Sequence, residues 1–259
     1  MANYDILGDI AIVKFPDETS KEEKLAKAKE LLANPSIKTV LEKANKVSGR
    51  LRTIKTNFIL GENKKETIYR ESGCSFKLNV ETCYFSPRLA NERLEVARMI
   101  AKSKKNSRVL VMFAGVAPFS IVIAKISSPR KVISVELGKD CNKYAIENVL
   151  KNKVGAVVSV IGGDVKRVIP KLGEKFDFVV MPRPNLKDTF LEQGLMVAKK
   201  GSVIVYYGFS PESKKDEMLE LLEQEAKKLK RKIKISEVLE AGDIAPYEHR
   251  YRVVIKILN

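Results

Sequence analysis

The chain has 259 residues, 44% of them hydrophobic and 31% charged, which is typical of a globular protein with one large or two modest domains. No apolar run approaches the roughly 20 residues of a membrane-spanning helix, and the N-terminus MANYDILGDI lacks the basic-then-apolar pattern of an export signal. Three cysteines without CxxC spacing argue against a structural zinc site and predict reduced thiols in a cytoplasmic protein.

The charge is strongly positive, because 48 Lys and Arg residues against 32 Asp and Glu residues give a net charge of +16. Such an excess attracts polyanions, and nucleic acid is the commonest polyanion in a cytoplasm. The alternative is lysine enrichment for solubility or heat tolerance, since many lysines stand beside glutamates, as in SKEEKLAKAKE. The charge favours a nucleic-acid partner over this alternative.

The first part of the chain, to about residue 75, predicts a small α+β domain. DIAIVKF, at residues 9–15, alternates like a strand and stops at Pro16. Residues 20–35 open with a serine cap and then repeat apolar residues at helical spacing, and residues 36–47 predict a second short helix. Two further strands are expected around the turn GENKK, over residues 51–61 and 65–73.

A strand over residues 76–85 and an amphipathic helix over residues 88–103 follow, and from about residue 108 apolar strands alternate with helices. This alternation indicates a parallel sheet covered on both faces. A long helix is expected over residues 210–232. Strands are expected at residues 108–113, 131–137, 156–163, 176–182, 201–209, 233–241 and 249–258.

Seven strands that end in an antiparallel hairpin fit a Rossmann-like class I methyltransferase fold with a mainly parallel sheet. We assign it to residues 76–259, with a connecting segment at residues 76–105. The smaller α+β domain of residues 1–75 precedes it and is expected to contact RNA.

Ligands of an open α/β sheet bind at the carboxyl ends of its strands. After the first strand, the small residues of FAGVAP (113–118) allow backbone to approach a ligand closely, and Pro118 fits the first turn of a helix. Glu136 ends the second strand, where it could accept hydrogen bonds from a ribose diol. Asp164 ends the third strand, where it could bind an adenine amino group. Together these features predict a site for an adenosine moiety.

Each feature has a plain structural alternative when taken alone. A turn of small residues is often only a tight strand-to-helix corner, and Glu136 or Asp164 could be a solvated loop acid or a helix cap. A dinucleotide is disfavoured, because no G-x-G-x-x-G follows the first strand.

Four stretches of the chain resemble the archaeal and eukaryotic tRNA guanosine-37 N1-methyltransferases. They are VLVMFAGVAPFSIVIAK, similar to the family's D-M-F-A-G-V-G-P-F-S-I turn, together with YFSPRLANER, VELGKDCNKYAIENVLKN, and FDFVVMPRP, which stands where the family has F-D-x-V-x-M-N-L-P. The resemblance implies S-adenosylmethionine as the cofactor. The expected cofactor contacts are Phe113, Ala114, Gly115, Val116, Pro118, Glu136, Leu137, Asp164, Val165 and Met181.

The chain departs from the family pattern at three places. The acid of the turn is replaced by Val111, and its second glycine by Ala117. The M-N-L-P stretch has become Met181 followed by Pro-Arg-Pro, which loses the asparagine amide. The hydrogen bonds of the missing acid would then come from backbone groups.

Methylation of N1 of guanine needs a carboxylate to accept the N1 proton and a donor to stabilise the charge that grows on O6. The resemblance implies Glu92 as the base, Arg52 as the stabilising donor, and Tyr84 as a positioning residue. Without the resemblance, the sequence favours plainer interpretations: Glu92 is a surface acid of an amphipathic helix, Arg52 is a phosphate contact or a surface charge, and Tyr84 is a core aromatic.

The resemblance also implies an RNA substrate, the anticodon loop of tRNA, whose base must be flipped out of the stack to reach the cofactor. Arg88 and Arg93 are expected to position the connecting segment of residues 76–105 or to contact phosphate. Pro182, Arg183 and Pro184 are expected to form the wall against which the base lies. We expect a monomer that needs no metal and contacts no membrane.

The sequence therefore predicts a tRNA methyltransferase that acts on N1 of guanosine 37. One alternative is an enzyme that also methylates the tricyclic wyosine intermediate, 4-demethylwyosine, at this position. A second is aminocarboxypropyl transfer from the same cofactor. The third, of another class, is a non-catalytic RNA-binding protein with a decayed cofactor site.

Overall fold

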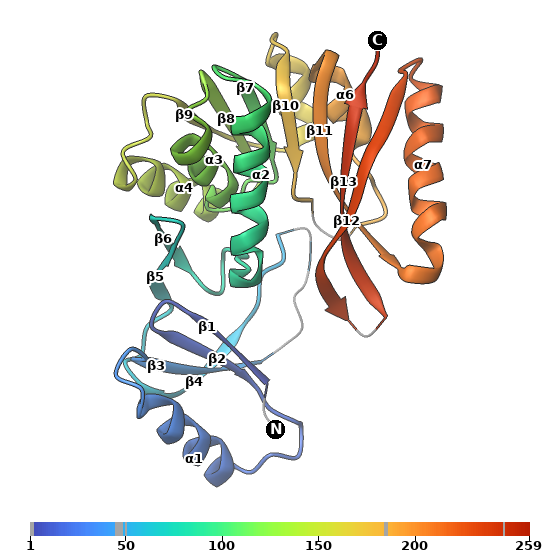
Figure 1. The fold of residues 1–259 in the computed structure, drawn as a ribbon. Coiled ribbons are helices and arrows are strands. Elements are labelled where there is room, and N and C mark those ends of the chain that lie inside the picture. The colour runs from blue at the N-terminus through green and yellow to red at the C-terminus, as the bar shows by residue number, and fades with distance from the viewer. Residues whose placement is uncertain (1–2, 45–48, 50, 184–185, 246) are drawn as a thin grey trace.

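The computed structural model describes residues 3–44, 49, 51–183, 186–245 and 247–259. The N-terminal unit is a four-stranded sheet in the order β1-β2-β3-β4 with one helix, α1, packed beside it (Figure 1). Ser20 and Glu23 form a capping box that starts α1. The elements are β1 (Asn3–Leu7), β2 (Ile10–Lys14), α1 (Lys21–Leu32), β3 (Thr39–Lys43) and β4 (Thr56–Gly61).

The second short helix predicted over residues 36–47 is wrong, because this stretch contains strand β3. Thr39, Val40 and Leu41 are buried, and β3 pairs parallel to β2 and antiparallel to β4. The apolar run is too short for periodicity to separate a strand from a helix, so pairing with two neighbours decides the conformation.

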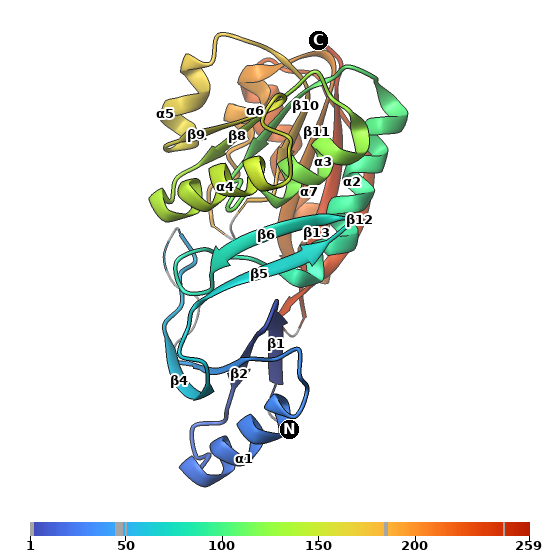
Figure 2. The same cartoon turned by 90° about the vertical axis from the view of Figure 1, so that its left-hand side faces the viewer.

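A hairpin connects the N-terminal unit to the large domain (Figure 2). It consists of β5 (Glu66–Glu71) and β6 (Cys74–Asn79), so the expected boundary at residue 75 lies inside β6. Two buried asparagines hydrogen bond to the backbone of β6. Asn148 lies in helix α4 (Lys139–Lys151), and Asn152 is the residue that follows this helix. Asn148 pairs with Lys77 at 2.7 and 3.0 Å, and Asn152 pairs with Ser75 at 2.9 and 2.7 Å.

The large domain contains a seven-stranded, mainly parallel sheet, as predicted, in the order β12-β13-β11-β10-β7-β8-β9. The pairings between β11, β10, β7, β8 and β9 are parallel, and β13 pairs antiparallel with β11 and β12. The strands are β7 (Arg108–Met112), β8 (Lys131–Glu136), β9 (Val158–Gly162), β10 (Phe176–Met181), β11 (Ala198–Pro211), β12 (Ile233–Ala245) and β13 (Glu248–Ile257).

Helices cover both faces of this sheet (Figures 1 and 2). One core cluster lies under α2, α3 and α4, and the other under α5, α6 and α7. Successive residues of β7 alternate between them, Val111 on one side and Met112 on the other, so the strand is apolar from Val109 to Met112. The remaining helices are α2 (Ala90–Ser103), α3 (Pro118–Ser127), α5 (Val165–Val168), α6 (Leu191–Val197) and α7 (Lys215–Lys228), with short 3-10 turns at Pro87–Leu89, Ile169–Lys171 and Glu212–Lys214.

Candidate active site

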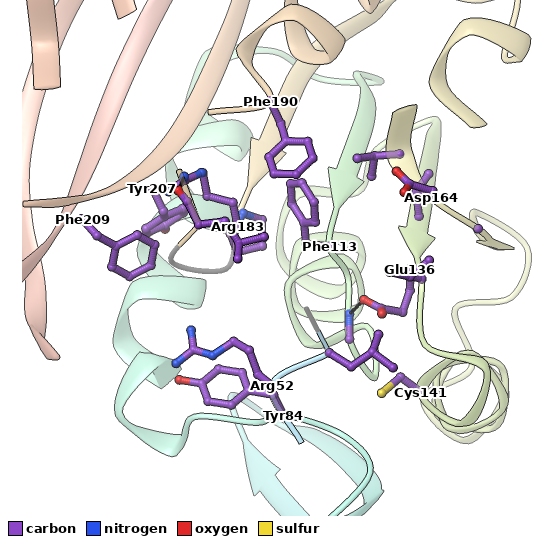
Figure 3. A pocket seen from close by; sticks show the side chains of 18 of the residues that line it. Arg52, Tyr84, Phe113, Glu136, Cys141, Asp164, Arg183, Phe190, Tyr207 and Phe209 are labelled. Atoms are coloured by element: carbon purple, nitrogen blue, oxygen red, sulfur yellow. Dashed lines mark hydrogen bonds between the residues drawn. The ribbon is translucent and has the colours of Figure 1, made fainter. Parts of the chain in front are cut away.

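A cavity lies at the carboxyl ends of β7, β8 and β9 and reaches across to strands β11 and β13 (Figure 3). The strand order changes direction on either side of β7, and such a switch point is where ligands bind in open α/β sheets. Residues that follow the three strands line one end of the cavity. Arg52, Tyr84, Tyr207, Phe209 and Arg250 line the other end.

The turn after β7 has three residues with left-handed backbone. Phe113, Gly115 and Ala117 have φ values of 58°, 57° and 66°. Gly115 takes this conformation without strain, whereas at Ala117 it costs about 1 kcal/mol. Phe113 and Gly115 line the cavity. The other expected contacts of the turn, Ala114, Val116 and Pro118, and Ala117 are absent from its described lining.

Glu136 ties the ends of two strands together. Its carboxylate accepts the Gly115 N–H at 2.8 Å and the Gly138 N–H at 2.7 Å, and the side chain also lines the cavity (Figure 3). Each carboxylate oxygen has two lone pairs, so capacity remains for ligand hydroxyls. Leu137, the next residue, is exposed and lines the same end.

Asp164 acts both as a cap and as a cavity residue. Its side chain accepts the N–H of Lys166 at 3.0 Å at the start of α5, which is the capping role that the sequence left open. Asp164 and Val165 also line the cavity beside Glu136. Met181 is different, because it is fully buried within β10 and is absent from the described lining.

The far end of the cavity is aromatic and basic. The Arg52 guanidinium stacks on the ring of Tyr84, 3.9 Å from its centroid (Figure 3). The Arg250 guanidinium lies 5.6 Å from the ring centroid of Phe209, and Arg250 and Tyr84 line the same end of the cavity. Two of the residues expected to act on the base, Arg52 and Tyr84, are therefore in contact.

Glu92 lies on α2 and is absent from the described lining of the cavity. One of its carboxylate oxygens accepts the Tyr207 hydroxyl at 2.8 Å and an N–H of Arg252 at 2.8 Å. Tyr207 is itself a cavity residue, so its side chain stands between Glu92 and the cavity. Burial, reinforced by the charge of Glu92, raises the pKa of Tyr207 well above its usual value, and the hydroxyl stays protonated.

Arg88 and Arg93, the two arginines of the connecting segment that were predicted to position it or to contact phosphate, each form an ion pair within the protein. Arg93 is buried and makes a two-pronged ion pair with Glu71 at 2.5 Å, which fastens α2 to the β5–β6 hairpin. Arg88 is exposed and pairs with Asp5 at 2.8 Å.

The segment after β10 forms one wall of the cavity through Pro182 and Arg183. The Arg183 guanidinium is buried, donates to the backbone carbonyls of Leu186 and Asp188, and lies 5.7 Å from the ring centroid of Phe209. Burial lowers the pKa of Arg183. Pro184, the third residue predicted for this wall, lies outside the described residues.

Sequence reasoning missed Tyr207, Arg250 and Arg252. The pattern in HRYRVV was available, because arginines two residues apart in an apolar strand point to the same face. In the β11–β13 ladder Arg252 lies opposite Tyr207, and Arg250 lies opposite Phe209. These four side chains form a row whose members could be paired only once the strand register was known.

The sheet order and a cavity at the ends of its first three parallel strands define a Rossmann-like methyltransferase fold. Residues 67–235 match the TRM5/TYW2 methyltransferase domain, and residues 1–64 match the TYW2 N-terminal domain. The chain therefore belongs to the TRM5/TYW2 family, as the motifs predict.

Curated relatives include both single-activity and bifunctional enzymes. The chain is 38% identical over 81% of its length to tRNA (guanine(37)-N(1))-methyltransferase Trm5b of Pyrococcus abyssi, of which it spans 61%. It is 32% identical over 78% of its length to tRNA 4-demethylwyosine(37)-methyltransferase Taw21 of Saccharolobus solfataricus, spanning 76% of that protein. It is 29% identical over 99% of its length to tRNA (guanine(37)-N(1))/4-demethylwyosine(37)-methyltransferase Taw22 of Nanoarchaeum equitans, spanning all of it.

Solved structures of the family superpose on 99% of the chain. Trm5b from Pyrococcus abyssi does so with a TM-score of 0.86 at 34% identity, covering 75% of that chain. The complex of aTrm5 with tRNALeu gives 0.86 at 26% identity and 72% coverage. TYW2 of M. jannaschii in complex with AdoMet gives 0.74 at 26% identity and 100% coverage.

Proposed function

We propose that this protein is an S-adenosylmethionine-dependent tRNA methyltransferase that methylates N1 of guanosine 37. The observation that carries the proposal is a single cavity with two chemically different ends. Carboxylates suited to an adenosine lie at the ends of β8 and β9, and the Arg52–Tyr84 stack and Tyr207 lie across from them. The names of the relatives specify the same reaction.

The residues at the first end fit the cofactor. Glu136 keeps free lone pairs for a ribose diol, and Asp164 lies in reach of the same space for an adenine amino group. Gly115 lines the cavity without a side chain that would obstruct the methionine end. S-adenosylmethionine, when bound there, supplies an electrophilic methyl group. Ala117 has a left-handed φ of 66°, and Val111 is packed in the core.

At the second end, we assign Glu92 as the final acceptor of the N1 proton. Tyr207 lines the cavity and already donates its hydroxyl hydrogen to Glu92. The guanine proton passes to the Tyr207 oxygen while the Tyr207 proton passes to Glu92, and Arg252 holds the carboxylate in place. Arg52, positioned by its stack on Tyr84, stabilises the charge that develops on O6.

The partner that we infer is the anticodon loop of tRNA, with guanosine 37 flipped against Pro182 and Arg183. The net charge of +16 and the tRNA complex of a solved relative support an RNA substrate. We further infer a cytoplasmic monomer that works without metal.

In the part of the chain that the structure describes, no helix is long and apolar enough to cross a membrane.

The direct test is methyl transfer to an unmodified tRNA transcript with guanosine 37, compared with the same transcript carrying adenosine at that position. We expect 1-methylguanosine in digests of the first transcript only. Incorporation into both transcripts, or into neither, would reject the proposal.

The second candidate is an enzyme that also methylates 4-demethylwyosine at position 37. It is favoured by the resemblance to Taw22 and Taw21 and by the replacement of the family's asparagine at Pro182. A tRNA carrying the tricyclic base separates the two, because a single-activity enzyme leaves it unmethylated.

The two remaining alternatives, aminocarboxypropyl transfer and RNA binding without catalysis, are tested by measuring what happens to S-adenosylmethionine. Aminocarboxypropyl transfer, named for a relative that is 31% identical over 79% of this chain, would release methylthioadenosine in place of S-adenosylhomocysteine. A decayed RNA-binding protein would show no heat of binding with millimolar S-adenosylmethionine in calorimetry.

A further inference from the structure

A second cavity lies on the other side of the Arg52–Tyr84 stack. It shares Arg52, Tyr84 and Arg250 with the active cavity and extends between the N-terminal unit and the connecting segment. These three side chains therefore form the boundary between the two cavities.

The second cavity is positively charged. Its charged lining residues are the cations Lys43, Arg52, Arg88 and Arg250 and the single anion Asp5, which is already paired with Arg88. The boundary itself carries two cations, Arg52 and Arg250, and no carboxylate.

Arg250 is a buried cation that has no counter-ion among the described residues. Its side chain is only 8% exposed, and no ion pair joins it to a carboxylate in the part of the chain that the structure describes. Arg252, two residues along the same face of β13, has Glu92, Glu95 and Glu237 at 2.8, 3.4 and 3.8 Å. Burial lowers the pKa of Arg250, and the charge of Arg52 acts in the same direction.

A buried, unneutralised guanidinium is unfavourable unless a ligand supplies the opposite charge. The planar fork of arginine matches phosphate oxygens, and a second guanidinium beside it adds further donors. An anion at this boundary would neutralise two like charges that otherwise repel each other.

We propose that Arg250 and Arg52 form a phosphate-binding site at the boundary of the two cavities, which takes the phosphodiester next to the inserted nucleotide. The base then lies in the active cavity, and the neighbouring nucleotide of the RNA lies in the second, basic cavity. This inference rests on the proposed function, because it assumes that a nucleotide enters the active cavity.

The test measures how the affinity for a tRNA transcript depends on salt. Each lost phosphate contact lowers the slope of log Kd against log salt by about 0.7 to 0.9. We expect the slope for R250Q to be lower than that of the parent by about this amount. Over a fourfold increase in salt, the Kd of R250Q should then rise about threefold less than that of the parent. The matched control is R98Q, which removes an exposed arginine of α2 that lines neither cavity. Its slope should fall by less than that of R250Q.

A second variant guards against misfolding. R250K keeps the charge but loses the fork, so we expect a slope like that of the parent with weaker affinity at every salt concentration. A slope for R250Q equal to that of R98Q would overturn the phosphate site.

The cofactor's carboxylate is the other anion that could reach this boundary. We expect calorimetry to give the same affinity of S-adenosylmethionine for R250Q as for the parent. Weaker cofactor binding with unchanged RNA binding would overturn the proposal in favour of the carboxylate. Because neither binding measurement needs methyl transfer, failure of the proposed function and failure of this site are told apart.

Discussion

The two ends of the active cavity hold their carboxylates in different ways. At the β8 and β9 end, Glu136 and Asp164 are held by backbone N–H groups of residues 2 to 21 positions away. Behind the opposite end, outside the described lining, Glu92 is held by the side chains of Tyr207 and Arg252, 115 and 160 positions away. The end that we propose for the cofactor is thus organised largely by the local chain. The arrangement around Glu92 exists only when α2, β11 and β13 pack together.

The largest effect is expected when the Glu92 carboxylate is removed and its shape is kept. Glu92→Gln should lower single-turnover methyl transfer by about 10²–10⁴-fold, which is the usual contribution of a general base. Binding of tRNA and cofactor should persist, and the exposed control Glu223→Gln should behave like the parent. Activity of E92Q near that of the parent would show that the distant cluster only supports the fold.

The contrast between Arg252 and Arg250 predicts opposite effects on stability. Arg252→Met leaves the largely buried Glu92 without its cation and should lower the free energy of unfolding by about 2–3 kcal/mol. Arg250→Met removes an unneutralised buried charge and should leave that free energy unchanged or raise it. Urea denaturation of both variants measures this, and equal losses would contradict the contrast.

Tyr207→Phe should have an intermediate effect on catalysis. It removes the hydroxyl that passes the proton from the base to Glu92, and we expect a loss of about 10²-fold in single-turnover rate, at the lower end of the range for a general base. The affinity for S-adenosylmethionine should not change. A rate equal to that of the parent would mean that Glu92 reaches the base without the tyrosine.

The smallest effect is expected at the locally organised end. Ala117→Gly should raise the free energy of unfolding by about 1 kcal/mol or less, because glycine tolerates the left-handed φ of 66° and is the better N-cap. Thermal melting would show a rise of a few degrees at most. A lower melting temperature would mean that the alanine methyl packs usefully and that the turn carries no strain.

Much of this architecture could be read from periodicity. The strands of the large sheet were predictable because buried parallel strands are continuously apolar, and the turn at residues 113–118 was recognisable by its small residues. The error at β3 arose because a short apolar run fits a helix or a strand equally well until its neighbours are known.

The end that we propose for the cofactor could largely be read from the sequence, since Glu136 ends its strand and Asp164 follows its own, and each accepts an amide two residues further along the chain. Tertiary structure adds the Gly115 N–H, which reaches Glu136 from the turn after the neighbouring strand. The arrangement around Glu92 was decided by tertiary structure alone. Glu92, Tyr207 and Arg252 sit on α2, β11 and β13, and only the antiparallel register of β11 with β13 sets Tyr207 opposite Arg252. Such a pairing depends on the packing of segments that are distant along the chain, and no local sequence pattern contains this information.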